Sequence, residues 1–430
     1  MSFSRPANSV SRRRGHARLI SLTIHELTPS LPNETRIDKS AGLSKHGDPA
    51  RIDELFNEQP NEHDWSHQHM TDLINIGIIG TGFARSTQIP AFRACPGARI
   101  VAIASGHREN AERVAGEFGI EHAFGDWREV VARDDVDLIS IVTPPVTHVE
   151  MTLAALEAGK SVLCEKPMAM NSQEAEVMSR RAADVKALTL IDHELRFLPG
   201  RIKMRQMIHS GEIGEVRHAK VHFRADSRAS TERKWDWWSN AESGGGTLGA
   251  IGSHAVDGLR WLLGAEVSKV FCSLATHVAA RLDERTGEMR PVTTDDEANL
   301  VLHFDESDLT KSTTATIALS VAEQGRPQHR LEVFGSKSAL RVEENGDLWQ
   351  AQTGAGEWKP VATDPGSLAP GMRDGGWSRG FTRFSRAIVV ALQAGRTTIE
   401  GAATFEDGYR TQLILDAARR SHESGAVARP

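Results

Sequence analysis

Apolar residues in this chain form short continuous runs that alternate with amphipathic segments, starting at residue 74. The runs are typical of buried β-strands and cover residues 74–79, 100–104, 138–142 and 161–164. The segments between them have helical spacing and cover residues 88–94, 108–118 and 148–158. This alternation predicts an α/β fold in which helices cover a parallel sheet.

Residues 1–70 have a different pattern, polar and without helical or strand periodicity. Five prolines interrupt the segment, which predicts a disordered extension or a mis-assigned start ahead of Met70. Several arginines precede the first acidic residue, Glu26, as in some targeting signals. The stretch that follows them is too short and polar for an export signal, so we do not expect targeting.

The first predicted strand ends in the turn Gly80-Thr81-Gly82-Phe83-Ala84-Arg85, and a helix follows. A strand, a glycine turn and a helix start are the arrangement that binds a dinucleotide pyrophosphate. We therefore expect five residues of this turn to contact the cofactor, namely Gly80, Gly82, Phe83, Ala84 and Arg85. Arg85 stands where the usual fingerprint has its third glycine. A surface turn is the alternative, and the surrounding strand and helix pattern argues against it.

The end of the second predicted strand bears on the choice between NAD and NADP. An acidic residue at this point would bind the ribose 2′-hydroxyl of NAD, but the chain has Ser105, His107 and Arg108 here. A hydroxyl and cationic donors suit a 2′-phosphate, so these residues favour NADP over NAD. Alternatively, Arg108 simply begins a solvated helix.

Length and charge exclude several classes of protein. With 430 residues the chain suits two or three domains, and its formal net charge of −6 gives no field to hold nucleic acid. No apolar run approaches the roughly 20 residues needed to cross a membrane. The three cysteines, Cys95, Cys164 and Cys272, offer neither a disulfide framework nor a metal site. We expect a soluble, cytoplasmic protein without a metal.

Three further motifs complete a family pattern. They are Thr-Pro-Pro-Val-Thr-His at 143–148, Ala-Gly-Lys-Ser-Val-Leu-Cys-Glu-Lys-Pro at 158–167 and Gly-Gly-Gly-Thr-Leu-Gly-Ala-Ile-Gly-Ser-His-Ala-Val-Asp at 244–257. With the glycine turn, the chain resembles the Gfo/Idh/MocA family, named for glucose-fructose oxidoreductase and inositol dehydrogenase. Pro145 departs from the family, which has asparagine there.

The resemblance implies two folded domains. Residues 71–195 would form a Rossmann NAD(P)-binding domain, and residues 196–424 an α/β domain with a large open, mainly antiparallel sheet. The second domain would bind substrate and support a homo-oligomer, a dimer or a tetramer. The motifs also imply further cofactor contacts, which are Thr143, Pro144, His148, Glu165 and Lys166.

The resemblance implies that Lys166 lies beside the nicotinamide, with Lys166–Pro167 often cis, and that His254 is the acid/base and touches substrate. Elementary chemistry supports these roles. Hydride loss from an alcohol needs a base near neutral pH, for which histidine is suited, and a lysine can stabilise the developing alkoxide.

Position 250 departs from the family, because Ala250 stands where relatives usually carry a third catalytic carboxylate. If residues 250–257 are helical, Asp257 shares a face with His254 and could orient it. An ordinary helix salt bridge is the alternative role for Asp257.

Three tryptophans, Trp235, Trp237 and Trp238, precede the last motif in a polar stretch. Aromatic faces suit sugar rings, so Trp237 is a candidate substrate contact. Such residues also fasten loops to a domain, which remains the alternative.

The function expected is an NAD(P)-dependent dehydrogenase or reductase acting on a CH–OH group of a sugar, polyol or related hydroxy compound. Two alternatives stay open. One is a non-catalytic NAD(P)-binding sensor, and the other is a redox-neutral NAD-dependent lyase or glycosidase on the same fold.

Overall fold

The computed structural model of the chain describes residues 73–430. The extension predicted for residues 1–70 lies outside the described residues.

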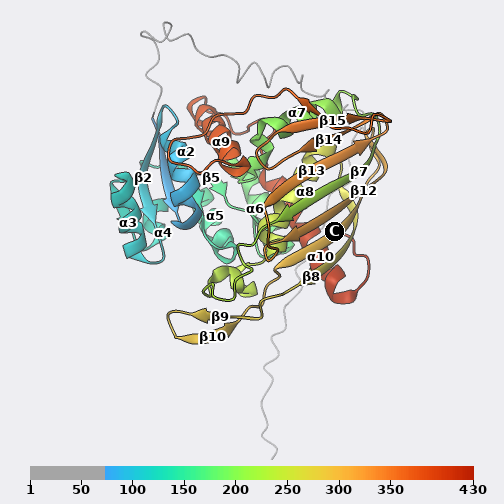
Figure 1. The fold of residues 1–430 in the computed structure, drawn as a ribbon. Coiled ribbons are helices and arrows are strands. Elements are labelled where there is room, and N and C mark those ends of the chain that lie inside the picture. Colours follow the sequence, from blue (N-terminus) through green and yellow to red (C-terminus); the bar gives the residue numbers. More distant parts are fainter. Residues whose placement is uncertain (1–72) are drawn as a thin grey trace, which may run out of the picture. The chain divides into compact units, whose positions relative to one another are not determined.

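The first part of the described chain is a six-stranded parallel sheet in the order β3-β2-β1-β4-β5-β6 (Figure 1). Its strands are β1 Ile74–Ile79, β2 Ala98–Ala104, β3 His122–Phe124, β4 Leu138–Ile141, β5 Ser161–Cys164 and β6 Thr189–Ile191. The helices between them are η1 Ala84–Gln88, α2 Ile89–Arg93, α3 Arg108–Phe118, α4 Trp127–Val131, η2 Pro145–Thr147, α5 His148–Glu157 and α6 Ser172–Ala183. The predicted alternation of strand and helix is confirmed, although the helix after the glycine turn begins at Ala84 and not at 88.

Apolar side chains bury both faces of this sheet. On one face Ile78 belongs to a cluster with Phe92 of α2 and Phe381 of α9 (Gly376–Gln393), and the two aromatic rings meet edge to face at 5.6 Å. On the other face Ile141 packs in a cluster with Met151 of α5. Helix α9, far along the chain, therefore completes the core of the first sheet.

The second sheet has eight strands in the order β16-β15-β14-β13-β7-β12-β11-β8. Only β7 and β12 pair in parallel, so the prediction of a large, mainly antiparallel sheet is confirmed. The strands are β7 Val216–Arg224, β8 Val267–Ala275, β11 Glu297–Phe304, β12 Thr310–Ser320, β13 Gln328–Gly335, β14 Ser338–Val342, β15 Leu348–Gln352 and β16 Lys359–Val361.

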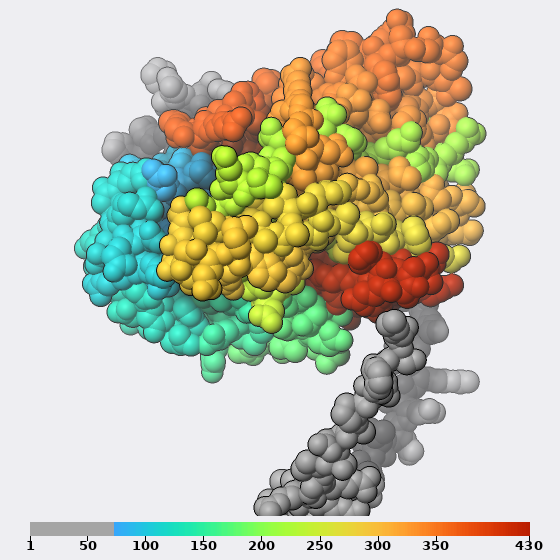
Figure 2. Space-filling model, turned by 60° about the horizontal axis from the view of Figure 1, so that its bottom comes forward, coloured from blue at the N-terminus to red at the C-terminus, as the bar shows by residue number. Residues whose placement is uncertain are grey.

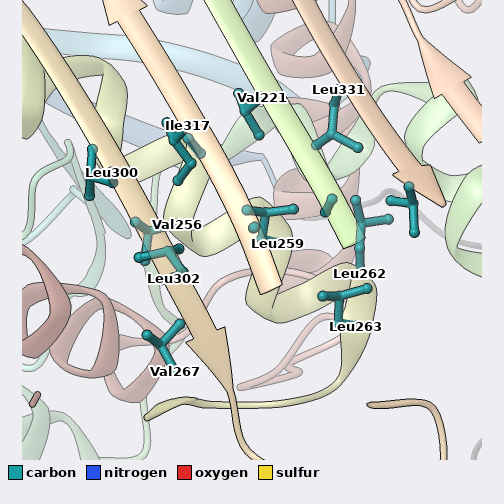
Figure 3. Packing of buried hydrophobic residues seen from close by; sticks show 14 of the residues in the cluster. Val221, Val256, Leu259, Leu262, Leu263, Val267, Leu300, Leu302, Ile317 and Leu331 are labelled. Atoms are coloured by element: carbon teal, nitrogen blue, oxygen red, sulfur yellow. The ribbon is translucent and has the colours of Figure 1, made fainter. Parts of the chain in front are cut away.

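Helices cover one face of the second sheet. They are α7 Pro199–His209, α8 Ser253–Leu263 and α10 Phe405–Ser424. A short helical turn, η3 Glu194–Phe197, precedes α7, and another, η6 Leu248–Gly252, precedes α8. Figure 3 shows Val256 and Leu259 of α8 beneath strand residues such as Ile317. Alternate residues of β11 are buried and exposed, as expected for a strand with one face on the core.

A two-stranded hairpin, β9 Ala280–Asp283 and β10 Glu288–Pro291, stands apart from both sheets. It forms part of the surface seen in Figure 2. Trp235 binds to it, because its indole N–H donates to the carbonyl oxygen of Pro291 at 3.1 Å and the Arg290 guanidinium lies 3.6 Å from the ring centre. Trp235 thus fastens the loop that follows β7 to the hairpin.

Two further short helical turns, η4 Trp237–Ser239 and η5 Ala241–Ser243, lie between β7 and η6.

Candidate functional site

The glycine turn opens a cleft of about 940 Å³ at the carboxyl ends of the first sheet's strands. Gly80 has φ +108°, and a Cβ there would lie 2.0 Å from the Val142 carbonyl oxygen, so only glycine fits. A Cβ at Gly82 would meet nothing within 4 Å, so this backbone faces open space. That is the arrangement a pyrophosphate requires, and the turn fits a dinucleotide.

Most of the residues predicted from sequence to bind cofactor or substrate line this cleft. They are Gly80, Gly82, Phe83, Ser105, Thr143, Pro144, Glu165, Lys166 and Trp237, with Ala250 beside them. The predicted residues outside its lining are Ala84, Arg85, Arg108, His148, His254 and Asp257.

Two predicted cationic cofactor contacts point elsewhere. Arg85 pairs with Glu117 at 2.6 Å, and Arg108 pairs with Glu112 at 2.8 Å. Both acids lie on α3, and all four side chains are well exposed. These pairs are worth little in water, so a bound phosphate could displace either acid.

His148 lies behind the cleft and not in its wall. The ring is fully buried, with Nε2 2.9 Å from the Thr143 carbonyl oxygen and Nδ1 3.1 Å from that of Pro167. Burial lowers the pKa of this imidazole. His148 therefore connects the 143–148 turn to Pro167, whose peptide bond with Lys166 is cis, as it often is in the family that the sequence resembles.

Lys166 projects from the end of β5 to the floor of the cleft. Its ammonium donates to the carbonyl oxygen of Ala250 at 3.4 Å and lies 3.9 Å from a carboxylate oxygen of Glu165. The side chain retains 19% exposure, enough to meet a ligand in the cleft.

Behind Lys166 lies a buried group of carboxyls. The Gln88 amide donates to Glu165 at 3.1 Å and to Asp192 at 3.0 Å, while its oxygen accepts from the Ser140 hydroxyl. Burial and the neighbouring carboxyls of Glu165 and Glu194 raise the pKa of Asp192 well above its ordinary value. Sequence reasoning named Glu165 as a cofactor contact but missed Gln88, Ser140 and Asp192, because they come from η1, β4 and the segment after β6.

His254 lies deeper, one turn beyond Ala250, and is 3% exposed. Its Nδ1 is 3.4 Å from Nδ1 of His193 and 3.9 Å from a carboxyl oxygen of Glu194. The Trp377 ring packs on the imidazole edge to face at 4.6 Å. Burial first, and then the Lys166 charge, holds the pKa of His254 well below its ordinary value, so the ring is neutral near pH 7.

Asp257 binds a partner that helical spacing alone does not indicate. Both of its carboxylate oxygens accept from the Arg196 guanidinium of η3, at 2.6 and 2.8 Å. It reaches His254 only through His193, whose Nε2 is 3.8 Å from the carboxylate. The structure thus shows a salt bridge, the alternative role considered for Asp257, although its partner lies on η3 and not on the same helix. A role for Asp257 in orienting His254 stays a prediction.

Trp237 and Trp238 both line the cleft, and Trp237 is 40% exposed.

Among residues 73–430, no helix is long and apolar enough to cross a bilayer. Within the same range, no group of three or more His, Cys, Asp or Glu side chains is arranged to hold a metal ion.

The parallel sheet, its glycine turn and the cleft at the strand ends define an NAD(P)-binding Rossmann oxidoreductase. Residues 74–193 match the family model "Oxidoreductase family, NAD-binding Rossmann fold", and residues 202–341 match the GFO/IDH/MocA C-terminal domain. The chain belongs to the Gfo/Idh/MocA family of oxidoreductases, as its motifs predicted.

Its relatives include proteins named for sugars. The chain is 31% identical to glucose-fructose oxidoreductase domain-containing protein 2 of Xenopus laevis, covering 83% of this chain and 93% of that protein. It is 27% identical to the levoglucosan dehydrogenase of Pseudarthrobacter phenanthrenivorans, covering 80% of this chain and 95% of that enzyme. A levoglucosan dehydrogenase solved with NADH and levoglucosan has the same fold, with TM-score 0.74, 24% identity and coverage of 83% and 99%.

Proposed function

We propose that this protein is an NAD(P)-dependent dehydrogenase that oxidises a secondary alcohol of a sugar, a polyol or a related hydroxy compound, or reduces the corresponding carbonyl. The observation that carries the proposal is the contact of Lys166 with Ala250 at the floor of the cleft, with His254 buried one helical turn behind Ala250. The sugar-related names of the relatives support the class of substrate.

The proposed mechanism assigns a separate task to each residue. The backbone of Gly80 and Gly82 would hold the pyrophosphate, and Thr143 and Pro144 would flank the nicotinamide end. A bound nicotinamide supplies the hydride acceptor for the carbon–hydrogen bond that breaks. Lys166 would stabilise the oxygen as it gains negative charge, and Nε2 of His254 would take the hydroxyl proton as the carbonyl forms.

Two features of His254 suit this task. Nε2 has no hydrogen-bond partner within the described part of the chain, and the ring is neutral near pH 7, so it can accept a proton. Because the ring is 3% exposed, substrate would have to displace part of its cover, and Trp377 is the aromatic side chain packed on it. Trp237, exposed in the cleft, would contact the sugar ring.

We further infer NADP as the preferred cofactor. The end of β2 offers Ser105 and His107 to the cleft and has no carboxylate of its own. Asp126 also lines the cleft, and its carboxylate pairs with the Arg128 guanidinium at 3.3 Å. Arg108 would have to leave Glu112 to reach it, and the NADH complex of levoglucosan dehydrogenase makes NAD the competing choice.

Two observations favour a non-catalytic sensor. Ala250 has no carboxylate where relatives usually carry one, and His254 is buried and does not line the cleft. A redox-neutral lyase or glycosidase would use the same fold without releasing reduced cofactor.

A panel of sugars and polyols, levoglucosan included, tests the proposal with the full chain and each oxidised cofactor. A dehydrogenase forms free reduced nicotinamide in proportion to oxidised product. Cofactor binding without turnover of any compound would indicate the sensor. Product without reduced cofactor would indicate the lyase or glycosidase.

We also propose a homo-oligomer formed through the outer face of the second sheet. Phe271 of β8 and Val301 of β11 are opposite each other in register and are 41% and 38% exposed. Adjacent apolar residues on an uncovered sheet face are typical of an interface.

A further inference from the structure

We propose that Glu194 is a positioning residue for His254, supplying from η3 the carboxyl group that this chain lacks at position 250. The proposal rests on the proposed function and deepens it. It assigns a task to a residue for which the sequence alone indicated no role.

The backbone fixes Glu194 close to the histidine. Helix α9 packs against η3 so closely that a Cβ on Gly380 would lie 2.6 Å from the carbonyl oxygen of Glu194. The Glu194 side chain is fully buried, and its Oε2 has no hydrogen-bond partner within residues 73–430. That same oxygen lies 3.9 Å from Nδ1 of His254. An unsatisfied buried oxygen is costly, so its place beside the imidazole calls for a role.

The hydrogen-bond network indicates which nitrogen of His254 is free. Nε2 of His193 faces the Asp257 carboxylate and would carry the proton there, which leaves Nδ1 of His193 as an acceptor. Nδ1 of His254, 3.4 Å away, would then be the donor. Nε2 of His254 keeps its lone pair and has no partner, so it is the atom available to substrate.

A carboxyl near Nδ1 matters once Nε2 has taken a proton, because the imidazole becomes cationic. A negative charge on Glu194 would stabilise that cation, the role that an acid plays beside a catalytic histidine in other enzymes. Ala250 has only a methyl group, whereas relatives are expected to carry the carboxylate on the same helical face. Glu194 approaches Nδ1 of His254 from η3, with its carboxyl oxygen 3.9 Å away.

Protonation of Glu194 gives the proposal a measurable signature. Burial raises the pKa of this carboxyl to about 8. The charged and titratable groups that influence or face it are Lys166, Glu165, Asp192, Arg201, His193 and His254. The raised pKa means that the carboxyl is neutral below about pH 8 and anionic above it. Oxidation should therefore become faster as the pH rises through about 8.

The test compares pH profiles of kcat/KM for the wild-type chain, Glu194→Gln and Glu194→Asp. We expect the rise near pH 8 to disappear in Glu194→Gln, with kcat/KM about tenfold lower above it, the equivalent of one pKa unit on His254. Glu194→Asp should keep the rise. Glu176→Gln, at a partly exposed position of α6 paired with Arg180, is the control and should leave the profile unchanged.

A second variant asks whether Glu194 replaces the family carboxylate. Adding Ala250→Asp to Glu194→Gln should restore at least part of the lost kcat/KM, while Ala250→Asp alone should not raise it. Loss of the same fraction of activity at every pH in Glu194→Gln, with the rise retained, would overturn the proposal.

A measurement without turnover separates this inference from the proposed function. In nitrogen NMR of the full chain, the His254 ring signals, assigned with His254→Gln, should show a step near pH 8 that Glu194→Gln removes. A step that persists in Glu194→Gln, or its absence in the wild type, would contradict the role of Glu194. A wild-type chain that shows the step but oxidises no sugar or polyol would contradict only the proposed function.

Discussion

The ammonium of Lys166 donates a hydrogen bond to the carbonyl oxygen of Ala250 at 3.4 Å. This contact joins the end of β5 in the first sheet to η6, which leads into α8 over the second sheet. The lysine is therefore held by main chain at the position where the family pattern would offer a carboxylate side chain. Its orientation does not depend on a side chain at position 250.

Replacing the lysine tests the charge at the cleft floor. Lys166→Met should lower turnover by about 10²–10³-fold, because a preorganised donor to the developing alkoxide is lost, and should weaken cofactor binding. Lys160→Met is a matched control, since that ammonium donates to the Arg133 carbonyl oxygen away from the cleft. Equal losses in the two variants, measured as kcat, would count against a specific role for Lys166.

The two glycines of the turn should respond differently to alanine. Gly80→Ala should destabilise the fold by about 1–3 kcal/mol, because its φ is positive and the new Cβ meets the Val142 carbonyl. Gly82→Ala meets no protein atom within 4 Å, so Tm should hardly change while cofactor affinity falls. Thermal unfolding and cofactor titration measure the two effects. Unchanged affinity in Gly82→Ala would show that the cofactor does not approach this backbone.

Cofactor preference depends on whether Arg108 exchanges Glu112 for a phosphate. Arg108→Ala should weaken NADP binding by roughly 1.5–3 kcal/mol, typical of a charge-assisted contact, with little effect on NAD. Arg113→Ala, on the same helix, serves as the control for general charge effects. Calorimetric titration with both cofactors measures this, and equal weakening of NAD and NADP by Arg108→Ala would exclude the assignment.

Assembly can be tested on the outer face of the second sheet. Phe271→Glu should convert the oligomer to smaller species, because it places a charge in an apolar contact. Met289→Glu, at a residue of the β9–β10 hairpin that is 61% exposed, should leave the assembly unchanged. The molar mass measured by light scattering gives the oligomeric state of each variant. A monomeric wild-type protein would refute the proposal directly.

Local patterns predicted four of the six strands of the first sheet and missed β3 and β6, which have only three residues each. The run at 74–79 and the segment at 161–164 coincide with β1 and β5, since buried parallel strands are continuous apolar stretches. The helix start at Ala84 was missed because η1 opens with a π-type turn directly after the glycines.

The site itself was only partly predictable from the sequence. Lys166 and His254 belong to local motifs, but Glu194 and Trp377 reach His254 from separate elements, and no local pattern reports such contacts. Asp257 illustrates the same limit. Helical spacing put Asp257 on the same face as His254, but its bidentate partner, Arg196, comes from η3.

The most direct test of the central claim is the turnover of a chain that lacks both proposed catalytic side chains. With a substrate found in the panel, Lys166→Met combined with His254→Ala should form reduced nicotinamide at least about 10²–10⁴-fold more slowly than the wild type, because general acid–base catalysis typically contributes that much. The variant should remain folded. Formation of reduced nicotinamide at the wild-type rate by this double variant would contradict the account.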